Sequence, residues 1–115
     1  DFGADRIYRV TSRLGDARRD EARMIGAALA PLGIVTGAFD RAEGSDIGPM
    51  LADGLPGVGL SQDGTRYFDI HHTPDDTLDK VDPVQLRQNV AAWTAALAIL
   101  AGPIAKAEPN RRSRR

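Results

Sequence analysis

Two adjacent histidines, His71 and His72, are the residues best suited to chemistry, and they are the only imidazoles in the sequence. Two carboxylates, Asp75 and Asp76, follow within a few positions. A neutral imidazole is a good zinc ligand, and a nearby carboxylate commonly holds its other ring nitrogen. Side chains of neighbouring residues in an extended strand diverge, so at most one of the pair is expected to bind a metal ion.

The same stretch also has an interpretation without a metal. A turn through His71, His72 and Thr73, with Asp75 or Asp76 capping the next turn, would need no ion, and the spacing alone does not decide between the two. The acidic residues from Asp69 to Asp82 lack the spacing and closing glutamate of a calcium loop.

Other chemistries have weaker support. The sequence has no cysteine, which excludes thiolate zinc sites and cysteine nucleophiles. The glycine-rich residues 54–59 are not followed by the Lys-Ser/Thr pair of a phosphate-binding loop. Ser45 and Ser61 lack the context of a nucleophile elbow. Serine hydrolysis and phosphate binding are therefore not expected.

The composition is that of a globular protein, with 115 residues, 27% of them charged, and a formal net charge of -1. This balance predicts no nucleic-acid partner. No apolar run approaches the roughly 18 residues that span a bilayer, so no membrane span is expected. We expect one structured unit over residues 1–106 and a basic, disordered tail over 107–115.

The elements around the histidines alternate between helix and strand. A helix is expected from Asp16, as its N-cap, to about Ala30, with Ala22, Ile25 and Leu29 on its apolar face. Short strands are expected at residues 34–36 and 58–60, and a helical turn at 49–51. Alternating elements predict an α/β fold, but so few strands cannot make a self-sufficient sheet.

The clearest expected element is a final helix after residue 82. Asp82 is placed to cap it, Pro83 suits its first position, and Gln85 is placed to complete a capping box. An apolar stripe with steps of four and three residues follows, and we expect it to pack in the core. The stripe consists of Leu86, Val90, Trp93, Leu97, Leu100 and Ile104.

Three segments together resemble family twenty-eight of the metallopeptidases, which contains di-zinc aminopeptidases and the carboxypeptidase Q group. The run HHTPDDTLDKVDP resembles the segment around the last zinc ligand. The run EGSDIGPMLADGLPGVGL resembles the family's Gly-Ser/Thr-Asp segment and the following strand, and DFGADRIYR resembles the segment that begins at a zinc-binding aspartate. The resemblance implies the C-terminal portion of a three-layer α/β/α zinc-peptidase fold with a mixed central sheet.

The resemblance also implies roles for individual residues. His72 matches the terminal zinc ligand, and Asp1 matches a ligand of the other position of the zinc pair. Asp46 matches a carboxylate near the active site, for substrate positioning or support of a ligand, although capping of a local turn explains it equally well. His71 matches a packing or substrate-side position, and Asp76 either orients His72 or caps a turn.

The family site also needs a histidine, a bridging aspartate, a further acidic ligand and a catalytic glutamate, and the resemblance places all of them before the segment that matches Asp1. The chain alone is therefore expected to be inactive. In the complete enzyme two zinc ions would polarise the scissile carbonyl and activate water, and the missing glutamate would accept its proton. Ile47 stands where many aminopeptidase relatives have histidine, which favours the carboxypeptidase Q branch.

The expected partners are a short peptide substrate and the missing N-terminal part of the same domain, and a homodimer is allowed. The resemblance suggests a periplasmic or extracellular location. Two alternatives remain open: a glutaminyl-cyclase-like zinc acyltransferase, and a peptidase-like binding module that has lost catalysis. The first would bind one zinc ion instead of two, and the retained His72 argues against the second.

Overall fold

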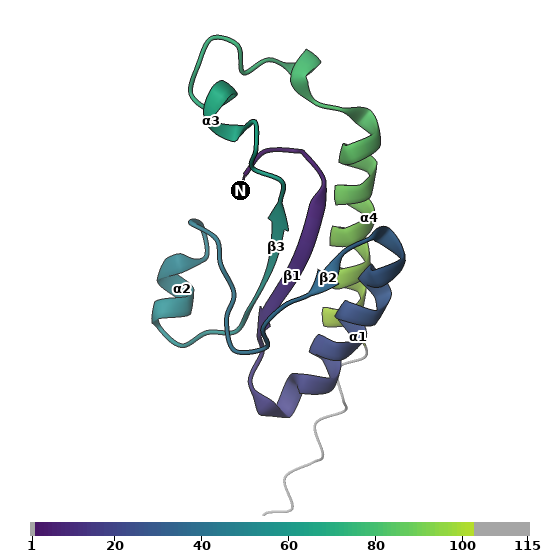
Figure 1. Ribbon diagram of the computed structural model, residues 1–115. Coiled ribbons are helices and arrows are strands. Elements are labelled where there is room, and N and C mark those ends of the chain that lie inside the picture. The colour runs from purple at the N-terminus through teal and green to yellow at the C-terminus, as the bar shows by residue number, and fades with distance from the viewer. Residues whose placement is uncertain (1, 103–115) are drawn as a thin grey trace, which may run out of the picture.

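The centre of the computed structural model, which describes residues 2–102, is a three-stranded mixed sheet in the order β2-β1-β3 (Figure 1). The long middle strand β1 (Ile7–Arg13) pairs parallel to β2 (Val35–Thr36) and antiparallel to β3 (Gly57–Gln62). An irregularity in the register between Ile7 and Arg9 lets Ile7 and Val10 both be buried, although they are three positions apart. The expected α/β class with a mixed sheet is confirmed.

The helix α1 (Arg19–Leu29) follows β1, and it buries Ala22, Ile25 and Leu29 as expected from their spacing. Its predicted cap is wrong. Asp16 begins a separate 3-10 turn, Asp16–Arg18, and its carboxylate accepts a hydrogen bond from Arg19 Nη2 at 2.6 Å instead of capping the helix. The helix ends through a second 3-10 turn, Ala30–Leu32, before β2 begins.

The helix α4 (Pro83–Leu100) lies beside α1 on the same face of the sheet (Figure 1). The prediction that Asp82 caps it is confirmed, because the Asp82 carboxylate accepts hydrogen bonds from the backbone N–H groups of Val84 and Gln85. The hydrogen bond from Val84 lowers the pKa of Asp82. The predicted capping box is wrong, since Gln85 Oε1 instead accepts from the backbone N–H of Arg6 at 2.6 Å.

The prediction that the large apolar stripe of α4 lies in the core is also wrong for the residues that the structure describes. Leu86, Val90, Trp93 and Leu97 are 42%, 57%, 44% and 57% exposed. The buried face of α4 is a neighbouring one made of small or polar side chains, namely Asn89, Ala92 and Ala96. Small side chains allow a close approach to α1 and β1, which leaves the bulky stripe outside. Leu100 packs at the edge of the core, and Ile104 lies outside the described residues.

The opposite face of the sheet is crossed by the chain that leads from β2 to β3. A Cβ atom at Gly59 would lie 3.0 Å from backbone atoms of Glu43, so any other residue here would require the crossing chain to shift. The short helix α2 (Gly48–Ala52) follows, and Arg13 Nη1 binds its Leu51 carbonyl oxygen at 2.7 Å. The expected helical turn at 49–51 is confirmed.

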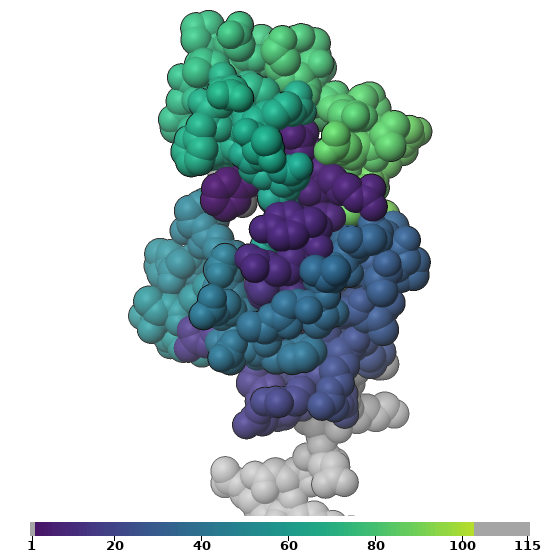
Figure 2. All heavy atoms as spheres, in the orientation of Figure 1, coloured from purple at the N-terminus to yellow at the C-terminus, as the bar shows by residue number. Residues whose placement is uncertain are grey.

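Between β3 and α4 the chain forms the short helix α3 (Tyr67–Ile70), the histidine turn and a 3-10 turn, Leu78–Lys80. Figure 2 shows this teal and green part separated from the blue part by purple N-terminal residues at the waist of the molecule. No helix in residues 2–102 is long and apolar enough to cross a membrane. The expected tail, 107–115, lies outside the described residues.

Candidate active site

The histidine turn begins directly after α3. The backbone N–H of His71 donates to Tyr67 O at 2.7 Å, and Thr73 Oγ1 donates to Ile70 O at 2.6 Å. His72, between them, has a φ of 57°, and among the described residues it alone is a non-glycine residue with positive φ. A bulky residue in this conformation indicates local strain, which functional sites often carry.

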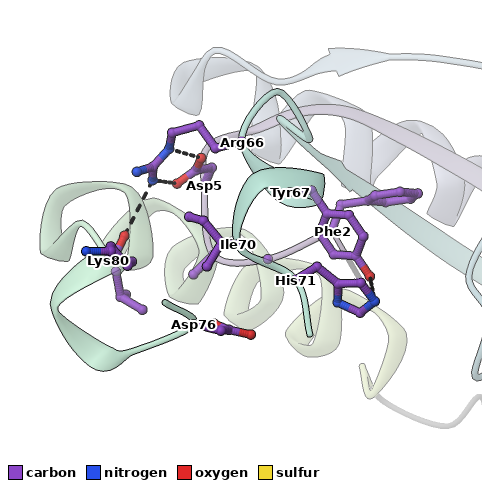
Figure 3. Close-up of a pocket in the computed structure, with 11 residues that line it drawn as sticks. Phe2, Asp5, Arg66, Tyr67, Ile70, His71, Asp76 and Lys80 are labelled. Carbon is purple, nitrogen blue, oxygen red and sulfur yellow. Dashed lines mark hydrogen bonds and ion pairs between the residues drawn. The ribbon is translucent and has the colours of Figure 1, made fainter. Parts of the chain in front are cut away.

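An aromatic column supports this turn from one side. Tyr67 is the middle member, because its ring stacks on His71 at 4.3 Å between centroids and meets Phe2 edge-on at 5.1 Å. The His71 ring in turn stacks on His72 at 3.6 Å. Tyr67 Oη lies 3.3 Å from His71 Nε2, within hydrogen-bonding distance (Figure 3). One nitrogen of His71 is thus already engaged, whereas the His72 side chain is exposed.

A pocket of about 150 Å³ lies beside the column, between the N-terminal segment and the segment that carries α3 (Figure 3). The side chains of His71 and Asp76 both line it. Phe2 and Tyr67 contribute apolar wall, while Asp5, Arg66 and Lys80 contribute charge. The pocket therefore combines an apolar wall with a few polar groups, as small-ligand sites do.

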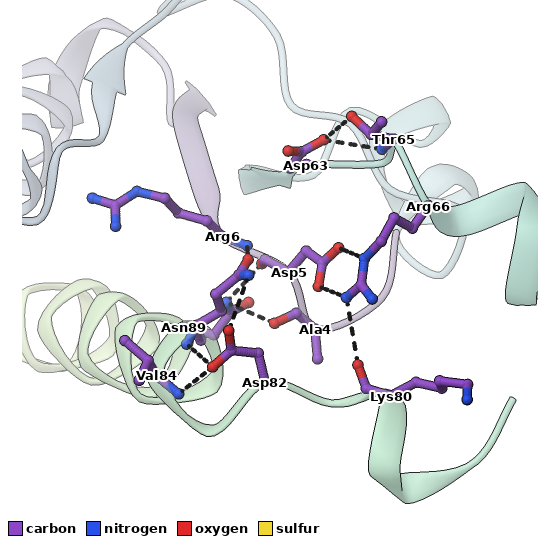
Figure 4. A network of polar contacts seen from close by, with 11 residues as sticks. Ala4, Asp5, Arg6, Asp63, Thr65, Arg66, Lys80, Asp82, Val84 and Asn89 are labelled. Carbon is purple, nitrogen blue, oxygen red and sulfur yellow. Dashed lines mark hydrogen bonds and ion pairs between the residues drawn. The ribbon is translucent and has the colours of Figure 1, made fainter.

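An ion pair closes one end of the pocket. Arg66 binds the Asp5 carboxylate through both Nε and Nη2, at 3.0 and 2.6 Å (Figure 4). Arg66 Nη2 also lies 3.4 Å from Lys80 O, so one guanidinium joins three segments of chain. The hydrogen bond to Asp5 raises the pKa of Arg66. The pair holds the N-terminal segment against the segment between β3 and α4.

Amide side chains of α4 fix the N-terminal segment from the other side. Besides the Gln85 bond to Arg6, Gln88 forms two bonds with the backbone of Ile7, accepting from its N–H at 2.9 Å and donating to its carbonyl at 2.7 Å. Asn89 Nδ2 donates to Asp5 O at 2.9 Å (Figure 4). These three residues, spaced i, i+3 and i+4, share one face of the helix. Gln88 and Asn89 were not predicted from the sequence, where their spacing indicates a shared helix face but not its partner.

The structure brings together only some of the residues predicted for the site. His71 stacks on His72 and shares the pocket with Asp76, but the pocket lining includes neither His72 nor Asp46. Asp46 is exposed in the turn before α2, and Asp1 lies outside the described residues. No group of three or more His, Asp or Glu side chains in residues 2–102 is placed to hold a metal ion. Zinc sites use three or four protein ligands, so these residues do not make a complete one.

Comparisons with known proteins place the chain among peptidases, although no family model matches it. It is 38% identical over 73 residues to carboxypeptidase Q of Xenopus laevis, which covers 64% of this chain and 15% of that protein. It is 35% identical over 86 residues to carboxypeptidase Q of Rattus norvegicus, which covers 75% of this chain and 18% of that protein.

A solved structure, that of a peptidase M28 precursor from Shewanella amazonensis SB2B, is also similar. It matches with a TM-score of 0.76 and 39% identity over 90% of this chain and 24% of that chain. The similarity to peptidases in both sequence and fold therefore extends over most of the chain. The chain spans less than a fifth of the length of these two curated relatives, and about a quarter of that structure.

Proposed function

We propose, since this chain belongs to the M28 family of peptidases, that it is the C-terminal segment of a zinc-dependent exopeptidase that releases terminal residues from short peptides. The observation that carries the proposal is the exposed His72, which stands in a strained turn within a chain 39% identical to a peptidase. The name carboxypeptidase Q, borne by the curated relatives, supports an exopeptidase.

His72 is proposed as a zinc ligand, and Asp1 as a ligand of the other position in a pair of zinc ions. His71 is the poorer candidate, because Tyr67 Oη already faces its Nε2. The stacked column instead holds the His71 ring against that of His72 and restricts its orientation. Zinc, when bound, supplies a Lewis acid that polarises a carbonyl group and lowers the pKa of a water molecule.

The remaining ligands and the catalytic glutamate are proposed to come from the rest of the peptidase, because the described residues do not form a complete metal site. The 115-residue chain alone is accordingly proposed to be inactive. His71 and Asp76 are assigned to the substrate side, since both line the pocket next to the histidine turn. Asp46 remains a proposed substrate-positioning residue.

The test uses the longer polypeptide that carries this segment. We expect two zinc ions per chain by elemental analysis, and hydrolysis of short peptides that stops with a chelator and returns with zinc. Peptides blocked at the amino or the carboxyl end then identify the terminus that is cleaved. His72→Ala should lower both the zinc content and kcat, because it removes a ligand.

The matched control is Asp75→Ala, an exposed residue three positions away that does not line the pocket. It should retain zinc and activity. Full activity of the metal-free protein would refute the proposal. One zinc per chain with glutaminyl cyclisation instead of hydrolysis would favour the acyltransferase, and a function that survives His72→Ala would favour a binding module.

We further propose a periplasmic or extracellular location. The description of the Shewanella relative as a precursor is consistent with processing of that protein. Fractionation of the cells that make the protein tests the location, and detection only in the cytoplasm would contradict it.

A further inference from the structure

The guanidinium of Arg66 closes the base of the loop 66–80, which carries both histidines. Arg66 stands directly before α3, and its Nη2 donates to the carbonyl oxygen of Lys80 at 3.4 Å, so the loop is held at both ends (Figure 4). The same guanidinium binds the Asp5 carboxylate. We propose that Arg66 is a positioning residue. It fixes the loop 66–80, and with it His72, against the N-terminal segment that follows Asp1 in the sequence.

The N-terminal segment is a rigid reference because other contacts fix it without Arg66. Its backbone is bound by Gln85 at the Arg6 N–H and by Asn89 at the Asp5 carbonyl. The N–H of Asp63 also donates to Arg6 O at 2.8 Å. The Asp5 side chain is only 16% exposed. Asp5 therefore presents a carboxylate of fixed position, to which the guanidinium of Arg66 can hold the loop.

The loop 66–80 has few bonds of its own to the rest of the molecule. Within residues 2–102, all hydrogen bonds of residues 67–80 remain inside residues 64–81. Only Arg66 reaches further, to Asp5, and the edge-on contact of Tyr67 with Phe2 lies beside it. The ion pair is thus the polar contact that docks the loop.

The geometry of the pair is better suited to positioning than to stabilisation. The Arg66 side chain is 48% exposed, and ion pairs at such exposed positions contribute little to stability. Two parallel N–H···O bonds nevertheless fix the relative orientation of both planar groups. A metal site requires its ligands to be held within about 0.5 Å. Loss of the pair should therefore weaken metal binding more than it lowers the stability of the fold.

The test compares Arg66→Gln with Arg18→Gln in the longer polypeptide. Arg18 is a matched control, because it also binds a carboxylate through Nε and Nη2, that of Glu21, but does not line the pocket. In competition with a chelator, Arg66→Gln should bind zinc about 10-fold more weakly than the unchanged protein. Arg18→Gln should bind zinc as tightly as the unchanged protein. Equal zinc affinities of the two variants would overturn the proposal.

A double-mutant cycle shows whether Arg66 acts through Asp5. The variants are Asp5→Asn, Arg66→Gln and the combination of both. The combination should lose no more zinc affinity than Arg66→Gln alone, because either change removes the same ion pair. Losses that add up in the combination would overturn the proposal, since the two side chains would then act independently.

Hydrogen exchange of the zinc-free polypeptide gives a measurement that needs neither metal nor activity. The amides of residues 66–80 should exchange several-fold faster in Arg66→Gln than in Arg18→Gln, whereas those of α4 should stay unchanged, which excludes a general loss of the fold. The inference rests on the proposed function. Unchanged exchange of the loop in an active zinc enzyme would refute the inference alone. Faster exchange in a protein that binds no zinc would refute the proposed function and support the docking of the loop by Arg66.

Discussion

Replacing Asn89 with leucine should strongly destabilise the chain, because this buried amide joins α4 to the N-terminal segment. Its Nδ2 donates to Asp5 O and to Gln85 O, both at 2.9 Å, and its Oδ1 accepts from Gln62 Nε2 at 3.3 Å. Asn89 is 5% exposed, so water cannot replace these bonds. Losing them and leaving the Asp5 carbonyl without its partner costs about 2–3 kcal/mol. For a domain of this size that corresponds to a fall in Tm of roughly 10 °C or more.

The variant Asn89→Asp separates hydrogen bonding from packing, because it keeps the shape of the side chain. An ionised carboxylate can only accept, and it would face the carbonyl of Asp5. The folded protein should therefore raise the pKa of the new carboxyl above its unfolded value of about 3.9. Its destabilisation should be greatest at neutral pH and shrink as the pH falls through the raised pKa, because the single O–H of the protonated group restores one of the two donated hydrogen bonds.

The assay is thermal or urea unfolding followed by circular dichroism, at neutral pH and at pH 4, with Thr94→Ala as the control. Thr94 is exposed on the same helix, and its hydroxyl donates to the Val90 carbonyl of that helix. The control should stay within about 0.5 kcal/mol of the unchanged chain. If Asn89→Leu also stayed within that range, the amide contacts would not hold the segment, and the reasoning would be wrong.

Three further changes test the packing and the caps, each by thermal unfolding. Ala92→Leu should lower the free energy of unfolding by about 1–3 kcal/mol, because it overpacks the buried face of α4. Ala91→Leu, on the exposed side, should change it little, and equal effects of the two variants would contradict the assignment of the faces. Gly33→Ala should cost about 1–2 kcal/mol, since φ is 76° there and the new Cβ would lie 2.6 Å from Arg6 Nη2; no change would refute this. Asp82→Ala should lower the Tm at neutral pH. Because the pKa of Asp82 is depressed in the folded protein, this difference in Tm should vanish as the pH falls through that pKa. A difference that stays constant with pH would show that the charge of Asp82 does not contribute to the cap.

Most elements of the fold follow from local patterns in the sequence. The spacing of Ala22, Ile25 and Leu29 predicts both the helix α1 and its buried face. Asp82 and Pro83 predict the start of α4 to the residue. These patterns depend only on residues close in the sequence, so they can be recognised without knowing which elements pack against the helix. Periodicity failed on α4 because it measures how apolar residues are spaced and not which neighbour they meet.

The site could be predicted only in part. The pair His71 and His72 is visible as the only imidazoles in the sequence, and the chain turns at these two residues. The stacking of Tyr67 on His71 was not predicted. The hydrogen bonds from the side-chain amides of Gln88 and Asn89 were not predicted either. These hydrogen bonds join residues more than 80 positions apart, and a single sequence does not show which distant residues will face each other. Asp46 was predicted from a resemblance to a motif. Such a resemblance does not give the distance from a residue to the rest of the site, and the structure does not place Asp46 at the pocket.

The exposed stripe of α4 and the proposed metal site, which residues 2–102 leave incomplete, would have a common physical explanation. A helix with large apolar side chains on one face and small or polar ones on another is suited to a position between neighbours, and residues 2–102 supply a neighbour only for the face with small side chains, at α1 and β1. Likewise His72 is held in a strained turn and supported by the column, yet fewer than the three acidic or imidazole ligands of a metal site converge anywhere in residues 2–102. Strain and exposed apolar surface both cost free energy, and sequences retain them where something compensates. A single partner, the remainder of the proposed peptidase, would compensate both, so covering Trp93 and completing the proposed zinc site should occur in the same polypeptide.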